Sequence, residues 1–267
     1  MKKVVITGST RGIGHGLAVE FLKRGCSVMI SGRKKEQVDR EVEKFSAAYG
    51  KEKVAGHPCE ITSYEQIQAL WDAAVKAFGT VDIWINNAGV THPTCNVMDL
   101  KPAEIKPVID TNITGLIYAN QIALRGMTAQ GHGFIYNMEG HGSHDEFIAG
   151  LSIYGATKRA VTYFTSSLLM ELDGTGVNAC LLSPGIVMTD FIIDEMRKLP
   201  PDRFETAKIV YNCLADTVET VTPWLAGQIL ANEESGKEIA WLDTEKANER
   251  FNSDEYCSRD LLSQFGL

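Results

Sequence analysis

One pair of side chains in this sequence has the types and the spacing needed to move a proton. Tyr154 and Lys158 lie four residues apart in the segment Tyr-Gly-Ala-Thr-Lys, and residues four apart share one face of an α-helix. An ammonium close to a phenol favours the phenolate, so we expect Lys158 to lower the pKa of Tyr154 from its usual value of about 10. Such a tyrosine can exchange a proton with a substrate oxygen near neutral pH. Because Tyr-x-x-x-Lys is common on helix surfaces, its meaning depends on the rest of the chain.

A glycine-rich turn near the start of the chain is typical of nucleotide binding. A predicted strand at Lys3–Thr7 leads into a predicted helix through Thr7-Gly8-Ser9-Thr10-Arg11-Gly12-Ile13-Gly14. Glycines permit a tight turn and let backbone N–H groups approach a pyrophosphate, and the helix N-terminus favours the negative charge. We therefore expect the residues from Gly8 to Gly14 to bind the phosphates of a dinucleotide.

The end of the second predicted strand, Ser27–Ser31, indicates which dinucleotide is bound. A site selective for NAD has an acid there that accepts a hydrogen bond from the ribose 2′-hydroxyl, whereas this chain has Gly32 and Arg33. A guanidinium can bind a 2′-phosphate through several donors, and Arg11 could add a second cation. The alternative is that Arg33 belongs to a solvated helix start. The sequence thus predicts NADP(H) as the cofactor.

The chain resembles the short-chain dehydrogenase/reductase family over nearly its whole length. The family's motifs occur in the family's order, as Thr7-Gly8-x-x-x-Gly12-x-Gly14, Asn86-Asn87-Ala88-Gly89, Asn112, Tyr154-x-x-x-Lys158 and Pro184-Gly185-x-Val187-x-Thr189. The resemblance implies that Tyr154 is the catalytic acid/base. It implies that Lys158 tunes Tyr154 and holds the nicotinamide ribose, and that Asn112 orients a water chain to Lys158. Cofactor contacts are implied for Glu60, Ile61, Asn87, Ala88, Gly89, Pro184, Gly185, Val187 and Thr189. Glu60 stands where the family usually has an aspartate.

The family's catalytic serine is missing from its usual position on the strand before the active-site loop. The residues there read Asn137-Met138-Glu139-Gly140-His141-Gly142-Ser143. Together with Tyr-Gly-Ala-Thr-Lys-Arg, this segment resembles the chlorophyll b reductase branch of the family, in which a serine occupies the position matching Ser143. The resemblance implies that Ser143 polarises the substrate oxygen, with His141 as the alternative donor.

The same loop carries four residues that could suggest a metal site, His141, His144, Asp145 and Glu146. Residues so close in sequence do not by themselves create a tetrahedral or octahedral arrangement. Hydride transfer in the resembled family also needs no metal. We therefore expect no metal ion, and interpret the loop as solvated and facing the substrate.

Short apolar runs alternate with amphipathic stretches and so predict the fold class. Strands are expected at 3–7, 27–31, 53–57, 81–85, 133–138, 177–182 and 237–242, separated by helices that include long ones at 102–129 and 154–172 and one starting at Thr222-Pro223. This alternation predicts a Rossmann-type, doubly wound parallel α/β sheet with helices on both faces. We expect a single domain over residues 1–267, with a substrate lid at 190–231 and a polar C-terminal extension at 243–267.

The composition excludes several other classes of protein. The 267 residues carry a formal net charge of −8, with acidic and basic residues interspersed, which argues against nucleic-acid or membrane-surface binding. The six scattered cysteines form no CxxC pair and are expected to be free thiols. No apolar run is long enough for a signal peptide or a membrane span. We expect a cytoplasmic protein with a small-molecule substrate, no nucleic-acid partner and no membrane insertion.

The segment after the last motif is rich in apolar residues, namely Phe191, Ile192, Ile193, Met196, Leu199 and Phe204. In the resembled family this region covers the substrate, so these residues favour a bulky hydrophobic carbonyl compound, although they could equally belong to the core. The branch resemblance favours the aldehyde of chlorophyll b or a related tetrapyrrole. The alternatives are a hydroxysteroid or bile acid, or a non-catalytic NADP-binding redox sensor.

The predicted helix 154–172 carries further apolar residues, Val161, Phe164, Leu168 and Leu169. Members of the family commonly pair this helix across a twofold axis. The resemblance therefore implies a homodimer or homotetramer.

Overall fold

The computed structural model describes residues 1–201 and 203–267 in full, and its core is one parallel sheet. The seven strands lie in the order β3-β2-β1-β4-β5-β6-β9, and each neighbouring pair is parallel. Their bounds are β1 Lys3–Ile6, β2 Ser27–Gly32, β3 Val54–Pro58, β4 Ile83–Asn86, β5 Gly133–Met138, β6 Val177–Ser183 and β9 Glu238–Ala240. The strand order reverses between β1 and β4, and ligands of such sheets bind at the carboxyl ends of the strands at this switch point. The predicted doubly wound Rossmann-type fold is confirmed.

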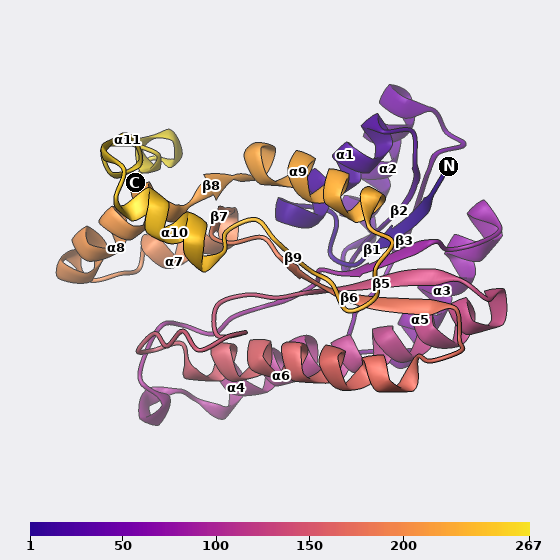
Figure 1. Cartoon of the computed structure of the whole chain (residues 1–267), viewed down its shortest axis with the longest axis horizontal. Coiled ribbons are helices and arrows are strands. Elements are labelled where there is room, and N and C mark those ends of the chain that lie inside the picture. The colour runs from indigo at the N-terminus through magenta and orange to yellow at the C-terminus, as the bar shows by residue number, and fades with distance from the viewer.

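Helices cover both faces of the sheet (Figure 1). One layer holds α1, α2 and α9, and the other holds α3, α4, α5 and α6. Their bounds are α1 Gly12–Lys23, α2 Lys35–Tyr49, α3 Tyr64–Phe78, α4 Pro102–Ile109, α5 Leu116–Gln130, α6 Ser152–Leu168 and α9 Val218–Ala231. Successive residues of a strand point to opposite faces, so in β1 Val4 and Ile6 pack beneath the first layer while Val5 packs beneath the second. Both faces of the sheet are therefore buried and must be apolar. This explains why the strands are near-continuous runs of apolar residues.

The predicted helix 102–129 is interrupted by a wide π-helical turn over Asp110–Gly115. Its residue Asn112 donates from Nδ2 to the carbonyl of Val90 and accepts at Oδ1 from the amide of Val90, at 2.8 and 2.9 Å. Hydrogen bonds between a helical side chain and a segment distant in sequence accompany a local widening of the helix here. The interruption separates α4 from α5.

The predicted helix start at Thr222-Pro223 is wrong. The helix α9 begins at Val218, and the hydroxyl of Thr217 caps it by accepting from the amide of Thr220. Pro223 consequently lies inside the helix rather than in its first turn. The Thr217 hydroxyl determines the helix start because it accepts from a backbone amide in the first turn, which has no partner within the helix. This contribution outweighs the preference of proline for the first turn.

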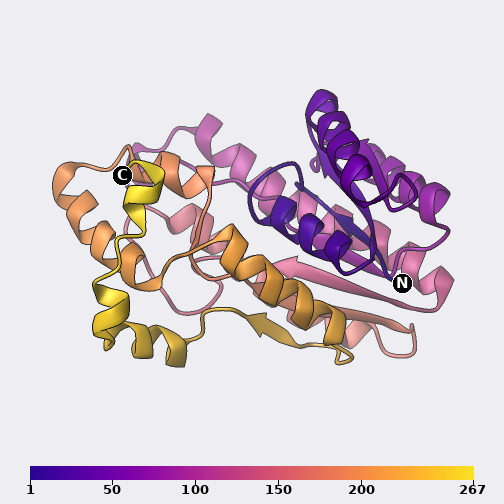
Figure 2. The ribbon, with the colours of Figure 1, turned by 90° about the horizontal axis from the view of Figure 1, so that it is seen from above.

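Beyond the main sheet, the chain builds a small C-terminal unit at one end of the molecule, opposite the N-terminus (Figure 2). It contains a two-stranded parallel sheet, β7 Val187–Met188 with β8 Asp216–Thr217, and four helices, α7 Asp190–Met196, α8 Pro201–Leu214, α10 Thr244–Phe251 and α11 Asp254–Cys257. The stretch after residue 243, which has no clear pattern in sequence, thus folds into short helices.

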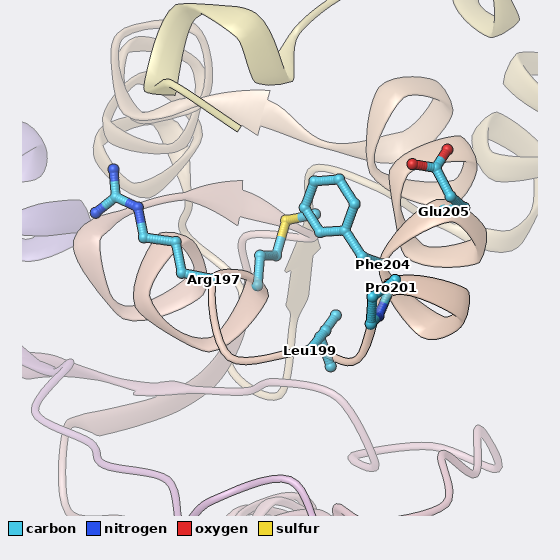
Figure 3. Close-up of a pocket in the computed structure, with 6 residues that line it drawn as sticks. Arg197, Leu199, Pro201, Phe204 and Glu205 are labelled. Carbon is cyan, nitrogen blue, oxygen red and sulfur yellow. The ribbon is translucent and has the colours of Figure 1, made fainter.

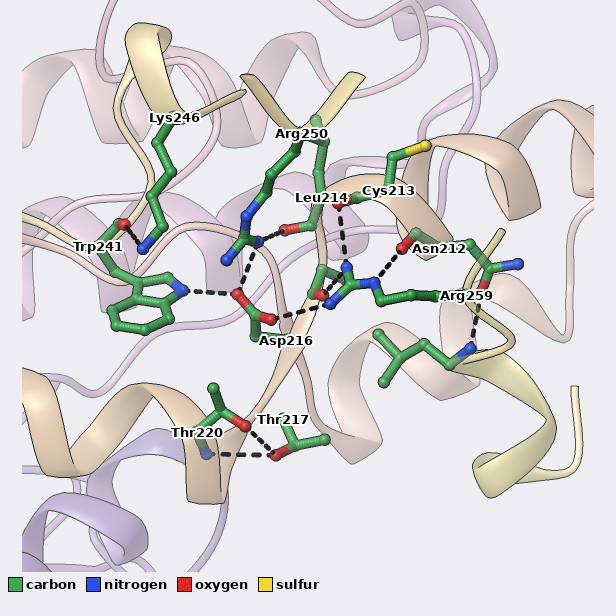
Figure 4. A network of polar contacts seen from close by, with 12 residues as sticks. Asn212, Cys213, Leu214, Asp216, Thr217, Thr220, Trp241, Lys246, Arg250 and Arg259 are labelled. Carbon is green, nitrogen blue, oxygen red and sulfur yellow. Dashed lines mark hydrogen bonds and ion pairs between the residues drawn. The ribbon is translucent and has the colours of Figure 1, made fainter. Parts of the chain in front are cut away.

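The buried carboxylate of Asp216 anchors this unit (Figure 4). It accepts from the indole N–H of Trp241 at 2.6 Å and pairs with the guanidinium groups of Arg250 at 2.7 Å and Arg259 at 3.3 Å. Arg250 is also buried, and Arg259 donates to backbone carbonyls at the end of α8. One carboxylate therefore ties β8, β9 and the last two helices together.

All six cysteines are free thiols, as predicted. Among the described residues, no helix combines the length and the apolar character that crossing a bilayer requires.

Removing the charge of Asp216 tests this anchor. We expect Asp216→Asn to lower the free energy of unfolding by about 3–5 kcal/mol, because it leaves the buried guanidinium of Arg250 without its counter-charge. Asp194→Asn is the matched control, since it breaks an exposed pair with Arg197 and should cost less than about 1 kcal/mol. Urea unfolding measures both, and equal effects of the two substitutions would contradict the anchor.

Candidate active site

The glycine turn between β1 and α1 adopts a backbone that side chains would obstruct. Gly8 and Gly12 have φ angles of 65° and 58°, in the left-handed region that glycine adopts readily. A Cβ on Gly14 would lie 2.5 Å from the Asn87 side chain and 2.6 Å from the carbonyl of Gly8. The first turn of α1 also has no side-chain cap, so its N–H groups remain open donors. These features fit the pyrophosphate of a dinucleotide.

The segment after β4 is fastened to this turn, as the strand order requires. Asn87 donates from its side chain to the carbonyls of Thr7 and Gly8 at 2.9 and 3.0 Å. The backbone amides of Asn87 and Ala88 donate in turn to the hydroxyl of Thr7. The structure therefore gives Asn87 and Ala88 a positioning role for the turn.

The end of β2 carries a glycine packed against the side chain of Thr10 in the turn. A Cβ on Gly32 would lie 2.8 Å from a methyl carbon of Thr10. The next residue, Arg33, is exposed. Beside the turn is a cavity of about 130 Å³ lined by Thr10, Arg11, Gln37, Arg40 and Glu41. Arg11 and Arg33 pair with no carboxylate among the described side chains, so both guanidinium groups are free to meet an anion.

Tyr154 and Lys158 lie on α6, where the end of β5 approaches it. The ammonium of Lys158 donates to the carbonyl of Met138 at 2.9 Å and lies 5.8 Å from the ring centre of Tyr154. A Cβ on Gly140 would lie 2.6 Å from the hydroxyl of Tyr154 and 3.1 Å from Cε of Lys158. The missing side chain of Gly140 thus lets the phenol and the amine share one space.

Burial sets the protonation of this pair in the cofactor-free chain. Desolvation raises the pKa of Tyr154 to about 12. It lowers the pKa of Lys158 to about 8, against an opposing effect of the Glu139 carboxylate. The direction for Tyr154 is opposite to the one expected from sequence, because desolvation dominates its pKa and the ammonium of Lys158 donates to a backbone carbonyl.

Asn112 connects three parts of the site. Besides both backbone groups of Val90, it donates to the hydroxyl of Thr157 at 3.0 Å, and this hydroxyl donates to the carbonyl of Tyr154. The Asn112 Oδ1 and the ammonium of Lys158 both lie beside Gly89, within 3.5 and 3.8 Å of where its Cβ would be. The structure therefore brings Asn112, Gly89 and Lys158 together.

Ser143 and His141 lie on the loop that follows β5. The Ser143 hydroxyl is buried, accepts from the amide of Gly140 at 3.1 Å and donates to the carbonyl of Lys158 at 3.4 Å. Nε2 of His141 is buried and has no hydrogen-bond partner among the described residues. Desolvation lowers the pKa of His141, which favours the neutral imidazole. Both candidates therefore lie close to α6.

The remaining predicted cofactor residues lie along the carboxyl edge of the sheet. Thr189 approaches the glycine turn, since its methyl carbon is 3.5 Å from where a Cβ on Gly12 would be. Pro184 and Gly185 follow β6, and Val187 lies in β7. Glu60 and Ile61 follow β3, where Glu60 accepts from the amide of Thr62 and Ile61 is buried.

Two residues near Tyr154 are not apparent as site residues from the sequence. His92 is buried and accepts at Nε2 from the backbone amide of Tyr154 at 3.2 Å. Glu139 is buried, and its carboxylate acts on Lys158 by opposing the fall of the lysine pKa. Neither carries a local signal, because the partners of each come from other segments.

The predicted lid combines core packing with a cavity. Phe191 packs against Tyr154 with ring centres 6.3 Å apart. Met196 and Phe204 pack with Leu261 and Leu262 of the C-terminal segment, so part of the apolar content is core. Between α7 and α8 is a cavity of about 350 Å³ whose lining does not include Tyr154 (Figure 3), and its residues are Met196, Arg197, Leu199, Pro201, Phe204 and Glu205.

Comparison with known proteins agrees with this geometry. A family model described as short chain dehydrogenase matches residues 2–199. Chlorophyll(ide) b reductase NOL of Oryza sativa subsp. japonica is 36% identical over 85% of this chain and 66% of its own length. Probable chlorophyll(ide) b reductase NYC1 of Arabidopsis thaliana is 31% identical over 90% of this chain and 50% of its own length. The chain thus spans half to about two thirds of these relatives.

Two further similarities widen the range of substrates and support the fold. The 3alpha-hydroxysteroid dehydrogenase of Mediterraneibacter gnavus is 32% identical over 72% of this chain and 76% of its own length. The crystal structure of a 3-ketoacyl-(acyl-carrier-protein) reductase from Brucella melitensis complexed with NADH superposes with a TM-score of 0.78 at 23% identity, covering 92% of this chain and 98% of the other. The plant relatives are named as chloroplastic, so the cytoplasmic location of this chain stays a prediction.

The pKa of Lys158 predicts how pH affects stability. A pKa of about 8 in the folded chain, against the ordinary 10.5, means that protonating Lys158 opposes folding fully below pH 8 and not at all above pH 10.5. Lys158→Met should therefore be more stable than the parent chain by at most about 3 kcal/mol at pH 7, and the gap should narrow between pH 8 and 10.5. Urea unfolding across this range measures it.

The control for this prediction is Lys35→Met. Lys35 is exposed and paired with Asp39, so its removal should cause no comparable pH-dependent gap. A gap between Lys158→Met and the parent chain that stays constant from pH 7 to 10.5 would contradict the depressed pKa of Lys158.

Proposed function

Since the chain belongs to the short-chain dehydrogenase family, we propose that it is an NADP(H)-dependent oxidoreductase that reduces the carbonyl of a bulky hydrophobic compound. The observation that carries this proposal is the shared space around Gly140, where the hydroxyl of Tyr154 lies beside the stem of Lys158 at the carboxyl edge of the sheet, just past the end of β5. A proton donor at this edge stands where the fold binds its ligands.

Each part of the site has a distinct task in this proposal. A nicotinamide cofactor, when bound, would supply the hydride that reduces the carbonyl carbon. Tyr154 gives its proton to the carbonyl oxygen, which needs a protonated phenol, and its raised pKa keeps that proton on at neutral pH. Lys158 holds the nicotinamide ribose with its ammonium, and Asn112 leads protons from solvent toward Lys158. Thus the buried pair donates one proton and recovers it through the lysine.

Ser143 is proposed to polarise the carbonyl oxygen, with His141 as the alternative donor. The amide of Gly140 donates to the Ser143 oxygen and holds it in place, and the hydroxyl proton would turn from its long 3.4 Å bond to the carbonyl of Lys158 toward the substrate oxygen. The alternative donor, His141, is supported by its buried Nε2, which has no hydrogen-bond partner among the described residues. Buried polar atoms without a partner are rare, so a substrate oxygen would supply the missing partner.

The preference for NADP(H) rests on Arg33 and Arg11. Gly32 offers no acid to accept a hydrogen bond from the ribose 2′-hydroxyl, and the two exposed guanidinium groups can bind a 2′-phosphate. The proposed cofactor contacts extend from the glycine turn to Thr189, along the residues at the carboxyl edge of the sheet.

For the substrate we propose an aldehyde on a tetrapyrrole of the chlorophyll b type. The names of the plant relatives and the apolar residues around Phe191 support this choice. The hydroxysteroid dehydrogenase relative supports a steroid or bile acid as the second candidate. Residues 190–231 would form the lid and residues 243–267 its support.

We also propose that the chain works as a homodimer or homotetramer. Exposed apolar side chains on or after α5 and α6, such as Ile117, Tyr163 and Met170, would be covered by a second copy.

Tyr154→Phe tests the proposed reaction. With NADPH and chlorophyllide b, kcat should fall by about 10²–10⁴-fold, because the substitution removes the proton donor. NADPH affinity, measured by fluorescence, should stay within about twofold. Tyr163→Phe, on the exposed face of the same helix, is the control and should keep full activity.

The steroid candidate is tested in parallel with 3-oxosteroids. Unchanged turnover in Tyr154→Phe would refute the assignment, and a parent chain that binds NADPH but reduces no carbonyl would favour the redox sensor.

Arg33→Ala tests the choice of cofactor. We expect the Kd for NADPH to rise by about 10- to 100-fold, since hydrogen bonds to a charged group contribute about 1.5–3 kcal/mol. The Kd for NADH should change less than about twofold, because NADH has no 2′-phosphate. Lys35→Ala is the neighbouring control. A parent chain that binds NADH as tightly as NADPH would contradict the proposal.

A further inference from the structure

Three side chains from separate segments meet beside the catalytic loop. Glu139 follows β5, His144 lies on the loop after it, and Glu238 begins β9. The topology brings them together, because β6 lies between β5 and β9: the amide of Glu139 donates to the carbonyl of Leu182, and Glu238 is in register with Leu181. One nitrogen and two carboxylate oxygens lie within 4.8 Å of one another.

The distances match those between ligands of one metal ion. Nε2 of His144 lies 3.2 Å from Oε1 of Glu238 and 3.6 Å from Oε2 of Glu139. Around a tetrahedral zinc ion with bonds of about 2.0–2.2 Å, neighbouring ligand atoms are roughly 3.3–3.6 Å apart. Two of the three separations thus already fit, and small rotations of the carboxylates would complete the set.

The buried carboxylate of Glu139 lacks a partner on one side. Its side chain is 0% exposed, and Oε1 accepts from the hydroxyl of Thr162 at 2.7 Å. Oε2, which points into the cluster, has no hydrogen-bond partner among the described residues. Lys158 does not supply one, since it donates to Met138. A buried carboxylate oxygen without a hydrogen bond is costly, and a cation in the cluster would remove that cost.

We propose that Glu139, His144 and Glu238 bind one Zn²⁺ ion through Oε2, Nε2 and Oε1, with water in the fourth position. Two carboxylates and a neutral imidazole balance the charge of the divalent ion. The imidazole nitrogen favours zinc over magnesium or calcium, which prefer oxygen ligands alone. His144 and Glu238 are 44% and 38% exposed, so the ion can enter from solvent.

The site would fasten the loop that carries Ser143 to the edge of the sheet. His144 follows Ser143 directly, whereas Glu238 belongs to β9. The loop acids considered from sequence do not contribute, because the Asp145 side chain is 86% exposed and pairs with Arg159. The carboxylates that replace them come from the residue after β5 and from the start of β9, which is why the spacing in sequence predicts no metal site.

Metal binding by the intact, tag-free chain tests this proposal without reference to its enzymatic activity. After dialysis against EDTA, titration with ZnCl₂ in a calorimeter should show one equivalent bound. Co²⁺ in place of zinc should give visible absorption bands of a tetrahedral ion. His144→Ala and Glu238→Gln should each weaken zinc binding by at least about tenfold, and Glu139→Gln should do the same.

The controls separate this site from incidental binding. His132→Ala removes another histidine that pairs with a carboxylate, Asp82, and should bind zinc as the parent chain does. Circular dichroism and NADPH binding report whether each variant is folded. Zinc should raise the Tm of the parent chain and of His132→Ala but not that of His144→Ala. Absence of stoichiometric binding, or binding that survives both His144→Ala and Glu238→Gln, would overturn the proposal.

Discussion

The ammonium of Lys158 must be buried and still have a partner, and much of the site follows from that constraint. Its partner is the carbonyl of Met138 at the end of β5, so α6 has to lie directly against this strand end. The stem of Lys158 and the hydroxyl of Tyr154 occupy the space where a Cβ on Gly140 would be, so the second residue after β5 has to be a glycine. The loop that follows is then drawn back over α6, where the Ser143 hydroxyl donates to the carbonyl of Lys158. Strand end, glycine and loop thus form one unit around one buried charge.

Features encoded by neighbouring residues are predictable from the sequence. The glycine turn, the strands and the Tyr154–Lys158 spacing each follow from local chemistry, and the parallel, doubly wound sheet follows from the alternation of strands with helices. Features that depend on distant contacts are not predictable in this way. Asn112 interrupts the long helix because it bonds Val90. Asp216 orders the C-terminal segment through Arg250 and Arg259, and no pattern in that polar segment indicates it.

The pKa of Tyr154 shows why a correct motif can still mislead about energetics. The spacing of Tyr154 and Lys158 correctly places both residues on one helix. It carries no information about solvent, and loss of solvent dominates both pKa values here. Burial opposes the charged form of each group, so the phenol keeps its proton and the amine loses its proton more readily. A donor for carbonyl reduction needs that state of the phenol, whereas the oxidation of an alcohol needs the opposite one.

The C-terminal segment connects stability with the shape of the cavity between α7 and α8. Leu261 and Leu262 pack against Met196 and Phe204. Met196 and Phe204 also line the cavity between α7 and α8. The same segment is held in place by the pairing of Arg259 with Asp216. The shape of the cavity is therefore set by a buried ion-pair network on β8 as much as by the residues that line it. The buried ammonium of Lys158 and the buried carboxylate of Asp216 therefore order separate parts of the fold, the first at the end of β5 and the second between β8 and the C-terminal segment.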